Sequence, residues 1–170
     1  MFRYFFLAVL LYAPISMAAE ETATFAGGCF WCMEPPFDKL EGVISTTSGF
    51  MGGSLENPTY KQVSRGGTGH AEVVQVLYDP DMVGYDSLLR TYWRNVDPYD
   101  GSGQFCDRGP EYRPAIFHHT EEQRRAAENS LKHLQSDGLI TDDVAVEIVA
   151  ASEFYPAEAY HQDYYQKNPA

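Results

Sequence analysis

The chain has 170 residues with 24 acidic and 12 basic side chains, so its net charge is −12. This length fits one compact domain with a core of its own, and a hydrophobic content of 44% excludes an intrinsically disordered chain. Nucleic acids and anionic membranes are excluded as partners, because both repel an acidic protein. We expect a monomer, in which the spread of negative charge serves solubility.

The first eighteen residues differ in composition from the rest. Arg3 precedes an apolar stretch over residues 4–11, and small residues follow before position 19. This is the layout of a secretory signal peptide. A membrane anchor is the alternative, but the stretch is short for a span and Pro14 follows it. We therefore predict a signal over residues 1–18, a single domain over residues 19–170, export to the periplasm, and no membrane insertion after cleavage.

The mature chain alternates between strand and helix patterns. We expect strands at residues 23–26, 43–50, 70–80, 113–118 and 145–151. We expect helices at residues 85–96, 120–138 and 157–166, with long irregular stretches at residues 53–69 and 95–112. This order predicts an α+β fold, with helices packed around a small, mostly antiparallel or mixed sheet.

The segment GGCFWCMEPPF, residues 27–37, holds two of the three cysteines. Cys29 follows a predicted strand and two glycines, so we expect it at a helix N-terminus, where the helix dipole and free N–H groups favour a thiolate. A buried structural cysteine beside core aromatics is the alternative. Pro35 and Pro36 leave two arrangements open: a helix that begins near Glu34 after an elbow, or a kinked helix.

The spacing of Cys29 and Cys32 allows a local disulfide, because residues i and i+3 of a helical turn lie about 5–6 Å apart. A thioredoxin-like disulfide oxidoreductase that uses this pair is therefore one alternative function. A secreted metal-binding module is another, although only Cys106 and scattered histidines are left to complete a zinc site. An odd number of cysteines in an exported protein indicates a thiol with a function.

Glu72 belongs to the predicted strand at residues 70–80, on the same face as Val74 and Val76. A carboxyl among apolar neighbours has a raised pKa and can donate a proton near neutral pH. The alternative is a glutamate near the strand end that reaches solvent past the glycine-rich loop before it.

Five segments together resemble the A-type peptide methionine sulfoxide reductases. They are GCFWCME at 28–34, GFMGG at 49–53, NPTYKQV at 57–63, TGHAEVVQVLYDP at 68–80 and DRGPEYRPAIF at 107–117. The match runs in order from about Thr24 to the HQDYYQKNP ending, which is nearly the whole mature chain. The resemblance implies a two-layer α/β sandwich that reduces methionine S-sulfoxide, with no bound cofactor or metal, and so repairs oxidised proteins.

The resemblance also implies the roles of the site residues. Cys29 is expected to attack the sulfoxide sulfur, and Glu72 to protonate the oxygen, which the Tyr60 and Tyr112 hydroxyls hold. Three further residues are expected to bind substrate: Phe30 and Trp31 around the S-methyl group, and Asp107.

Cys32 is a departure from the family pattern, in which many members have glycine here and recycle through cysteines in a C-terminal tail. This chain has no cysteine after Cys106. The sulfenic acid of Cys29 must therefore react with Cys32, with Cys106, or with an external thiol. We prefer Cys32, because its spacing alone meets the distance rule for a disulfide. A thioredoxin-like dithiol is the expected external reductant.

Overall fold

The computed structural model describes residues 19–141 and 143–169; the predicted signal peptide lies outside the described residues. The described strands are β1 (Glu21–Ala26), β2 (Val43–Met51), β3 (Ala71–Tyr78), β4 (Gly103–Gln104), β5 (Asp107–Arg108), β6 (Ala115–His118), β7 (Glu147–Ala150) and β8 (Tyr155–Pro156). Six of them form one sheet in the order β7-β6-β1-β3-β2-β8, and β4 and β5 form a separate hairpin. Neighbours in the sheet are antiparallel except β6 and β7, which are parallel. The prediction of a mixed, mostly antiparallel sheet is confirmed.

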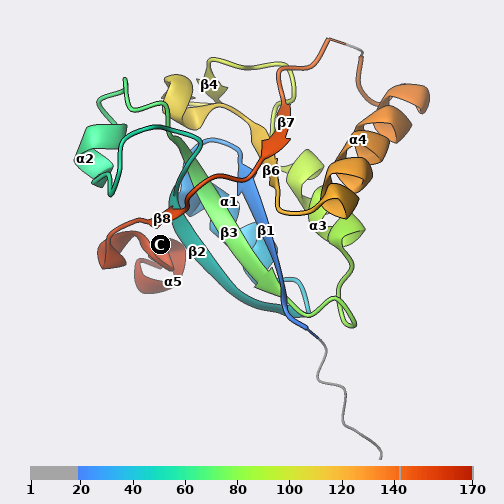
Figure 1. The fold of residues 1–170 in the computed structure, drawn as a ribbon, viewed down its shortest axis with the longest axis horizontal. Coiled ribbons are helices and arrows are strands. Elements are labelled where there is room, and N and C mark those ends of the chain that lie inside the picture. Colours follow the sequence, from blue (N-terminus) through green and yellow to red (C-terminus); the bar gives the residue numbers. More distant parts are fainter. Residues whose placement is uncertain (1–18, 142, 170) are drawn as a thin grey trace, which may run out of the picture.

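The helices pack against this sheet and against each other. They are α1 (Phe30–Asp38), α2 (Tyr60–Val63), α3 (Tyr85–Arg94), α4 (Glu121–Ser136) and α5 (Tyr164–Lys167), with 3₁₀ turns η1 (Pro110–Tyr112) and η2 (Ala159–His161). Helix α1 covers β2 and β3, while α3 and α4 pack together beside it (Figure 1). In the described part of the chain, no helix is long and apolar enough to cross a membrane.

The alternation along β3 divides its residues between two cores. Val74 and Val76 lie in the main core under α1, whereas Ala71 and Val73 lie in a smaller cluster on the other face. Phe37 of α1 is fully buried in the main core and stacks on Phe25 with ring centroids 5.0 Å apart. Burial of a side chain this size contributes about 1.5–3 kcal/mol. This packing fixes α1, and with it the cysteine at its N-terminus.

The prolines do not displace the start of α1. The helix begins at Phe30 and continues through Pro35 and Pro36, so the elbow arrangement is wrong. Proline removes the N–H that would bond to the carbonyl four residues earlier. The carbonyls of Trp31 and Cys32 therefore lose their helical donors, and packing of α1 against the sheet compensates.

Three regions differ from the predicted elements. The loop at 53–69 contains α2, and the stretch at 95–112 contains the β4–β5 hairpin and η1. The predicted helix at 157–166 is divided into η2 and α5 because Asp163 adopts a left-handed φ of 54°. These elements have two to four residues each, too few for a periodic pattern to indicate them.

Candidate active site

Cys29 is the N-cap residue of α1, directly after β1 and two glycines. The Cys32 N–H donates to the Cys29 carbonyl at 3.0 Å, so both cysteines belong to the first turn of one helix. Gly28 has φ 85°, and a Cβ there would lie 2.7 Å from the Gln104 Cβ. Only glycine fits this passage, which brings Cys29 into a tight turn against the β4–β5 hairpin.

Glu72 lies on β3 beneath the first turn of α1 and is only 1% exposed. Its Oε2 accepts a hydrogen bond from the Phe30 N–H at 3.1 Å, one residue after Cys29. In the described part of the chain, this is the one hydrogen-bond partner of the carboxyl. The solvent-reaching alternative for Glu72 is therefore wrong, and the carboxyl lies next to the helix turn that begins at Cys29.

Burial raises the pKa of Glu72 to about 8, with smaller contributions from Asp107 and Glu111, while the Phe30 N–H opposes the rise. The carboxyl is therefore protonated at neutral pH. Burial also raises the pKa of the Cys29 thiol, to about 12, and the Glu72 carboxylate adds to that effect. The expected helix-terminal thiolate is thus wrong for the resting state, because loss of hydration outweighs the helix dipole and the Trp31 N–H.

Tyr60 and Tyr112 come from separate elements, at the start of α2 and the end of η1. Burial raises the pKa of both hydroxyls, and the Glu72 carboxylate raises each further. A contact with Tyr112 partly offsets the shift at Tyr60. Both phenols stay protonated at working pH, and they can act as hydrogen-bond donors near the Glu72 carboxyl.

All three cysteines line one cavity of about 370 Å³, together with Asp107 and the N-terminal half of α1. Cys29 is half-buried, whereas Cys32 and Cys106 are exposed. Cys106 reaches the cavity from the tip of the β4–β5 hairpin, which is a tertiary contact that sequence spacing does not give. Both candidates for the second thiol therefore lie beside Cys29.

The aromatic residues after Cys29 form a wall with the C-terminal segment. Phe30 is buried and packs on His161 at 5.1 Å between ring centroids. Trp31 is half-buried and stacks flat on Tyr164 at 3.7 Å with an 8° interplanar angle. The same His161 ring lies 4.3 Å from Tyr60.

His161 and Tyr164 are site residues that sequence reasoning missed. His161 is 1% exposed, neither ring nitrogen has a hydrogen-bond partner among the described residues, and burial lowers its pKa, which favours the neutral ring. The signal in the sequence was their spacing of three residues, which places both rings on one side of a short turn. That spacing has no meaning until the segment is known to pack on α1.

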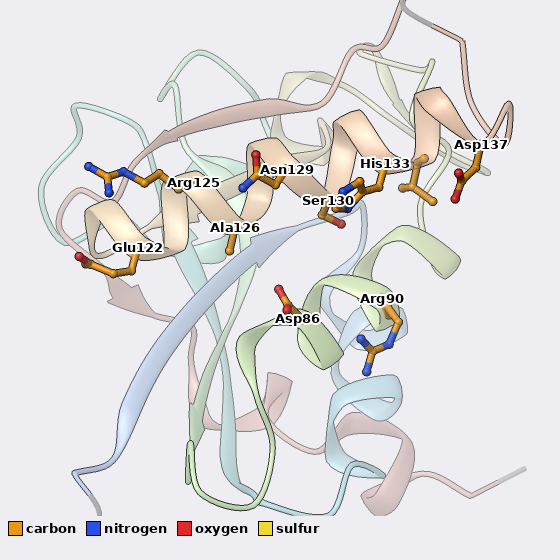
Figure 2. Close-up of a pocket in the computed structure, with 10 residues that line it drawn as sticks. Asp86, Arg90, Glu122, Arg125, Ala126, Asn129, Ser130, His133 and Asp137 are labelled. Atoms are coloured by element: carbon orange, nitrogen blue, oxygen red, sulfur yellow. The ribbon is translucent and has the colours of Figure 1, made fainter.

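A larger cavity of about 640 Å³ lies elsewhere, between α3 and α4 (Figure 2). Charged and polar side chains of both signs line it, such as Asp86, Arg90, Glu122 and Arg125, and no cysteine does. Across residues 19–141 and 143–169, no group of three or more His, Cys, Asp or Glu side chains is placed to hold a metal ion. The redox-capable groups gather at the smaller cavity beside Cys29.

Comparison with known proteins decides among the remaining functions. The family model described as peptide methionine sulfoxide reductase matches residues 21–170. The chain belongs to this family. It is 53% identical over 150 residues to the peptide methionine sulfoxide reductase MsrA of Bacillus licheniformis, covering 88% of this chain and 83% of that protein. It is also 53% identical to the MsrA of Ligilactobacillus salivarius over 151 residues, covering 89% and 88%.

Solved structures of methionine sulfoxide reductases share the fold. Methionine sulfoxide reductase A of Corynebacterium diphtheriae superposes with a TM-score of 0.81 at 36% identity, covering 91% of this chain and 77% of that one. Reduced Mxr1 of Saccharomyces cerevisiae gives 0.82 at 30% identity, covering 94% and 90%. The protein is therefore an enzyme that reduces peptide methionine sulfoxide, and the thioredoxin-like oxidoreductase alternative is not favoured.

Proposed function

We propose that Cys29 attacks the sulfur of methionine S-sulfoxide while Glu72 protonates the leaving oxygen. The observation that carries this proposal is the Glu72 carboxyl, with its pKa near 8, bonded 3.1 Å from the N–H of the residue after Cys29. Sulfoxide oxygen leaves only after it gains a proton. A neutral buried acid beside the thiol can supply that proton, and no charged donor has to lose its hydration.

The proposed reaction has three balanced steps. The Cys29 sulfur forms a bond to the sulfoxide sulfur while Glu72 protonates the oxygen, and the S–O bond breaks. Transfer of the resulting hydroxyl to the Cys29 sulfur breaks the new S–S bond, which releases methionine and leaves the sulfenic acid of Cys29. The thiol proton restores the Glu72 carboxyl. A second thiol then displaces hydroxide from the sulfenic sulfur, forming a disulfide and water, and an external dithiol reduces that disulfide.

The neighbouring side chains would hold the substrate. We assign the Tyr60 and Tyr112 hydroxyls to the sulfoxide oxygen, since both remain protonated donors. Phe30 and Trp31 would enclose the S-methyl group against their aromatic wall. Asp107, on the cavity wall with Cys29, would accept a hydrogen bond from the main chain of a peptide substrate.

Cys32 is the thiol that we assign to the second step. It shares the first turn of α1 with Cys29, and its N–H contacts the Cys29 carbonyl at 3.0 Å. Cys106 lines the same cavity but belongs to a separate element, the tip of the β4–β5 hairpin. In a Cys32→Ser variant we expect one methionine per enzyme and loss of recycling, whereas Cys106→Ser should recycle normally. Normal recycling by Cys32→Ser would transfer this role to Cys106 or to an external thiol.

The reductant that we propose is a thioredoxin-like dithiol protein. The yeast neighbour Mxr1 has been crystallised in complex with Trx2, and Cys32 here is exposed to such a partner. A dithiol reductant should support many turnovers, and a monothiol at the same thiol concentration should support few.

Substrate epimers test the proposed activity directly. The enzyme, freed of reductant and mixed with separated S and R sulfoxides of a methionine peptide, should form one equivalent of methionine from the S epimer only. Equal yields from both epimers, or activity with the R epimer alone, would contradict the assignment.

We also propose that residues 1–18 direct export to the periplasm and are then removed. The support is the sequence layout alone, a basic residue before an apolar stretch and small residues before position 19. Mass spectrometry of the protein expressed from the full chain should find an N-terminus at Ala19. A cytoplasmic protein that keeps Met1 would overturn this proposal.

A further inference from the structure

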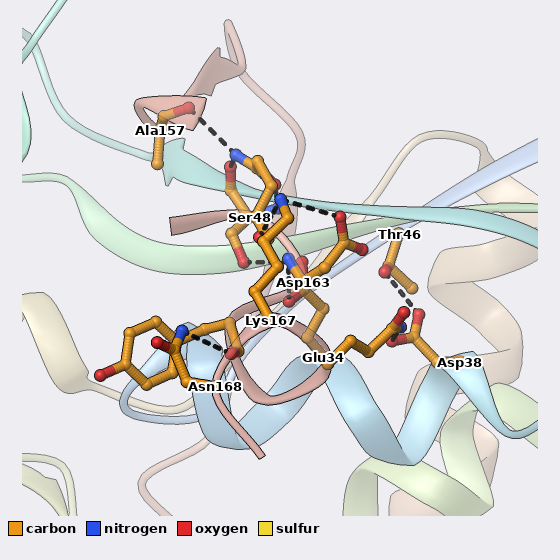
Figure 3. A network of polar contacts seen from close by, with 11 residues as sticks. Glu34, Asp38, Thr46, Ser48, Ala157, Asp163, Lys167 and Asn168 are labelled. Atoms are coloured by element: carbon orange, nitrogen blue, oxygen red, sulfur yellow. Dashed lines mark hydrogen bonds and ion pairs between the residues drawn. The ribbon is translucent and has the colours of Figure 1, made fainter. Parts of the chain in front are cut away.

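Glu34 is a buried carboxyl of α1 that the proposed reaction does not use. It is only 2% exposed, and each of its oxygens bonds to a different part of the chain. The Ser48 hydroxyl donates to Oε1 at 3.1 Å, and the Asp163 N–H donates to Oε2 at 3.0 Å. A buried carboxyl with both oxygens satisfied links α1 to β2 and to the C-terminal segment (Figure 3).

The residue next to Asp163 strengthens the same link. The Ser48 N–H donates to Gln162 Oε1 at 2.8 Å, and Gln162 Nε2 donates to the carbonyls of Ser48 at 2.8 Å and Ala157 at 3.0 Å. These bonds imitate a strand pairing at the edge of β2. Residues 162 and 163 are therefore fixed on both sides, by β2 and by α1.

The fixed residues lie immediately before Tyr164, the ring that stacks on Trp31. Asp163 has a left-handed φ of 54°, a conformation that is unfavourable for most non-glycine residues and that hydrogen bonds to the main chain help to stabilise. Glu34 holds it through the main-chain N–H. Tyr164 follows Asp163 directly, and its ring stacks on Trp31 at 3.7 Å.

We propose that Glu34 is a positioning residue for the reductase: its carboxyl orients Asp163 so that Tyr164 holds the Trp31 indole in place. The inference deepens the proposed function, because it rests on the assignment of Trp31 to the S-methyl group. Loss of the Glu34 carboxyl should loosen substrate binding while Cys29 and Glu72 keep their geometry.

The test compares three variants of Glu34 in single-turnover kinetics with a methionine S-sulfoxide peptide. Glu34→Ala removes both bonds, and Glu34→Leu fills the space without an acceptor if the alanine variant folds poorly. Each should raise the substrate concentration at half-saturation roughly tenfold and change the maximal rate less than twofold. Glu34→Gln should behave as the wild type, since its oxygen can accept from Asp163 while its amide donates to the Ser48 hydroxyl.

Fluorescence of Trp31 separates positioning from simple destabilisation. The chain has two tryptophans, so Trp93→Phe leaves Trp31 as the only reporter. In that background Glu34→Ala and Glu34→Leu should shift the emission in the same direction as Tyr164→Leu, which removes the stacking ring. Thr120→Ala, which loses the cap of α4, should destabilise the protein without moving either readout.

Unchanged half-saturation and unchanged Trp31 emission in a folded Glu34→Ala or Glu34→Leu variant would overturn the inference. Trp31→Leu distinguishes this failure from a failure of the proposed function. If Trp31→Leu leaves half-saturation unchanged, the methyl-group assignment is wrong, and the emission shift alone decides the role of Glu34.

Discussion

Two buried glutamates, Glu72 beneath the first turn of α1 and Glu34 within its second turn, differ in their partners. Glu72 lies under the first turn of α1, and the Phe30 N–H is its one hydrogen-bond partner in the described part of the chain. Glu34 lies in the second turn, and both of its oxygens accept hydrogen bonds. Burial raises the pKa of each carboxyl, and the Ser48 hydroxyl opposes the rise at Glu34.

The difference shows that burial alone does not make an acid catalytic. The Glu34 carboxyl is buried with both oxygens bonded within the fold, so it is closed to a substrate and serves to hold the chain together. A carboxyl with one partner keeps an oxygen for the proton that a reaction needs. The same chemical group thus serves catalysis at the first turn of α1 and holds the fold together from its second turn.

Replacement of Cys29 should have the largest effect, because both carboxyls act around this thiol. Cys29→Ser is expected to abolish turnover and single-turnover formation of methionine, since a hydroxyl cannot take up the sulfoxide oxygen as a sulfenic acid. Chromatography of the products, together with circular dichroism, checks this result. Residual methionine above the uncatalysed background in a folded Cys29→Ser protein would show that another thiol attacks.

Replacement of Glu72 should have the second-largest effect on activity. Glu72→Gln keeps the shape of the side chain but removes the proton donor, so the single-turnover rate should fall by about 10²–10⁴-fold, the usual size of a general-acid effect. Glu34→Gln should change the same rate by less than about threefold, since its network survives. Equal losses in the two variants would remove the distinction between them.

The pH dependence of stability should also separate Glu72 from ordinary carboxyls. Because its folded pKa is about 8 and its ordinary value is 4.5, the acid ionises in the unfolded state first. The free energy of unfolding should therefore fall by up to about 1.4 kcal/mol per pH unit between these two pKa values. The effect is absent below pH 4.5 and constant above pH 8. Urea unfolding should find Glu72→Gln more stable than the wild type at pH 8.5 and equal to it at pH 4.

Glu56→Gln, at an exposed loop position before α2, is the matched control for that measurement and should leave the free energy of unfolding close to that of the wild type at both pH values. If the free energies of unfolding of the wild type and Glu72→Gln change with pH in the same way from pH 4 to pH 8.5, the raised pKa of Glu72 is contradicted.

The smallest effect should be on the reactivity of the resting thiol. Burial first and the Glu72 carboxylate second raise the pKa of Cys29, so Glu72→Gln should lower it. In a background without Cys32 and Cys106, iodoacetamide should then alkylate Cys29 severalfold faster at pH 9 in Glu72→Gln than with Glu72 present. The variant would thus reduce sulfoxide more slowly than the wild type, although its Cys29 thiol would be alkylated faster. Slower alkylation would show that Glu72 does not repel the thiolate.

Local patterns predicted the parts of the fold and site that depend on neighbours in sequence. The alternation along β3 placed Glu72 on the face of Val74 and Val76, and the capping box placed Thr120 at the start of α4. The resemblance to the family supplied the remaining candidates residue by residue. In the structure, Cys29 and Asp107 line one cavity, and Phe30 follows Cys29 directly in α1.

The rest could not be predicted, because it depends on contacts between distant segments. The bond from Asp163 to Glu34 spans 129 residues, and it lies at the residue where the last predicted helix breaks. The pKa of Cys29 was misjudged for the same reason: the helix-dipole rule is local, whereas burial and Glu72 come from the packed fold. The approach of Cys106 to Cys29 likewise depends on how the β4–β5 hairpin folds back on α1.

The infrared difference spectrum between the wild type and Glu72→Gln tests the central claim most directly, that a protonated Glu72 lies beside Cys29 at neutral pH. Glu34 is present in both proteins, so its bands cancel. The wild type should show the carbonyl stretch of a protonated carboxyl at pH 7, which disappears on titration with a midpoint near 8. A midpoint near the ordinary value of 4.5, with no protonated band at pH 7, would contradict the account.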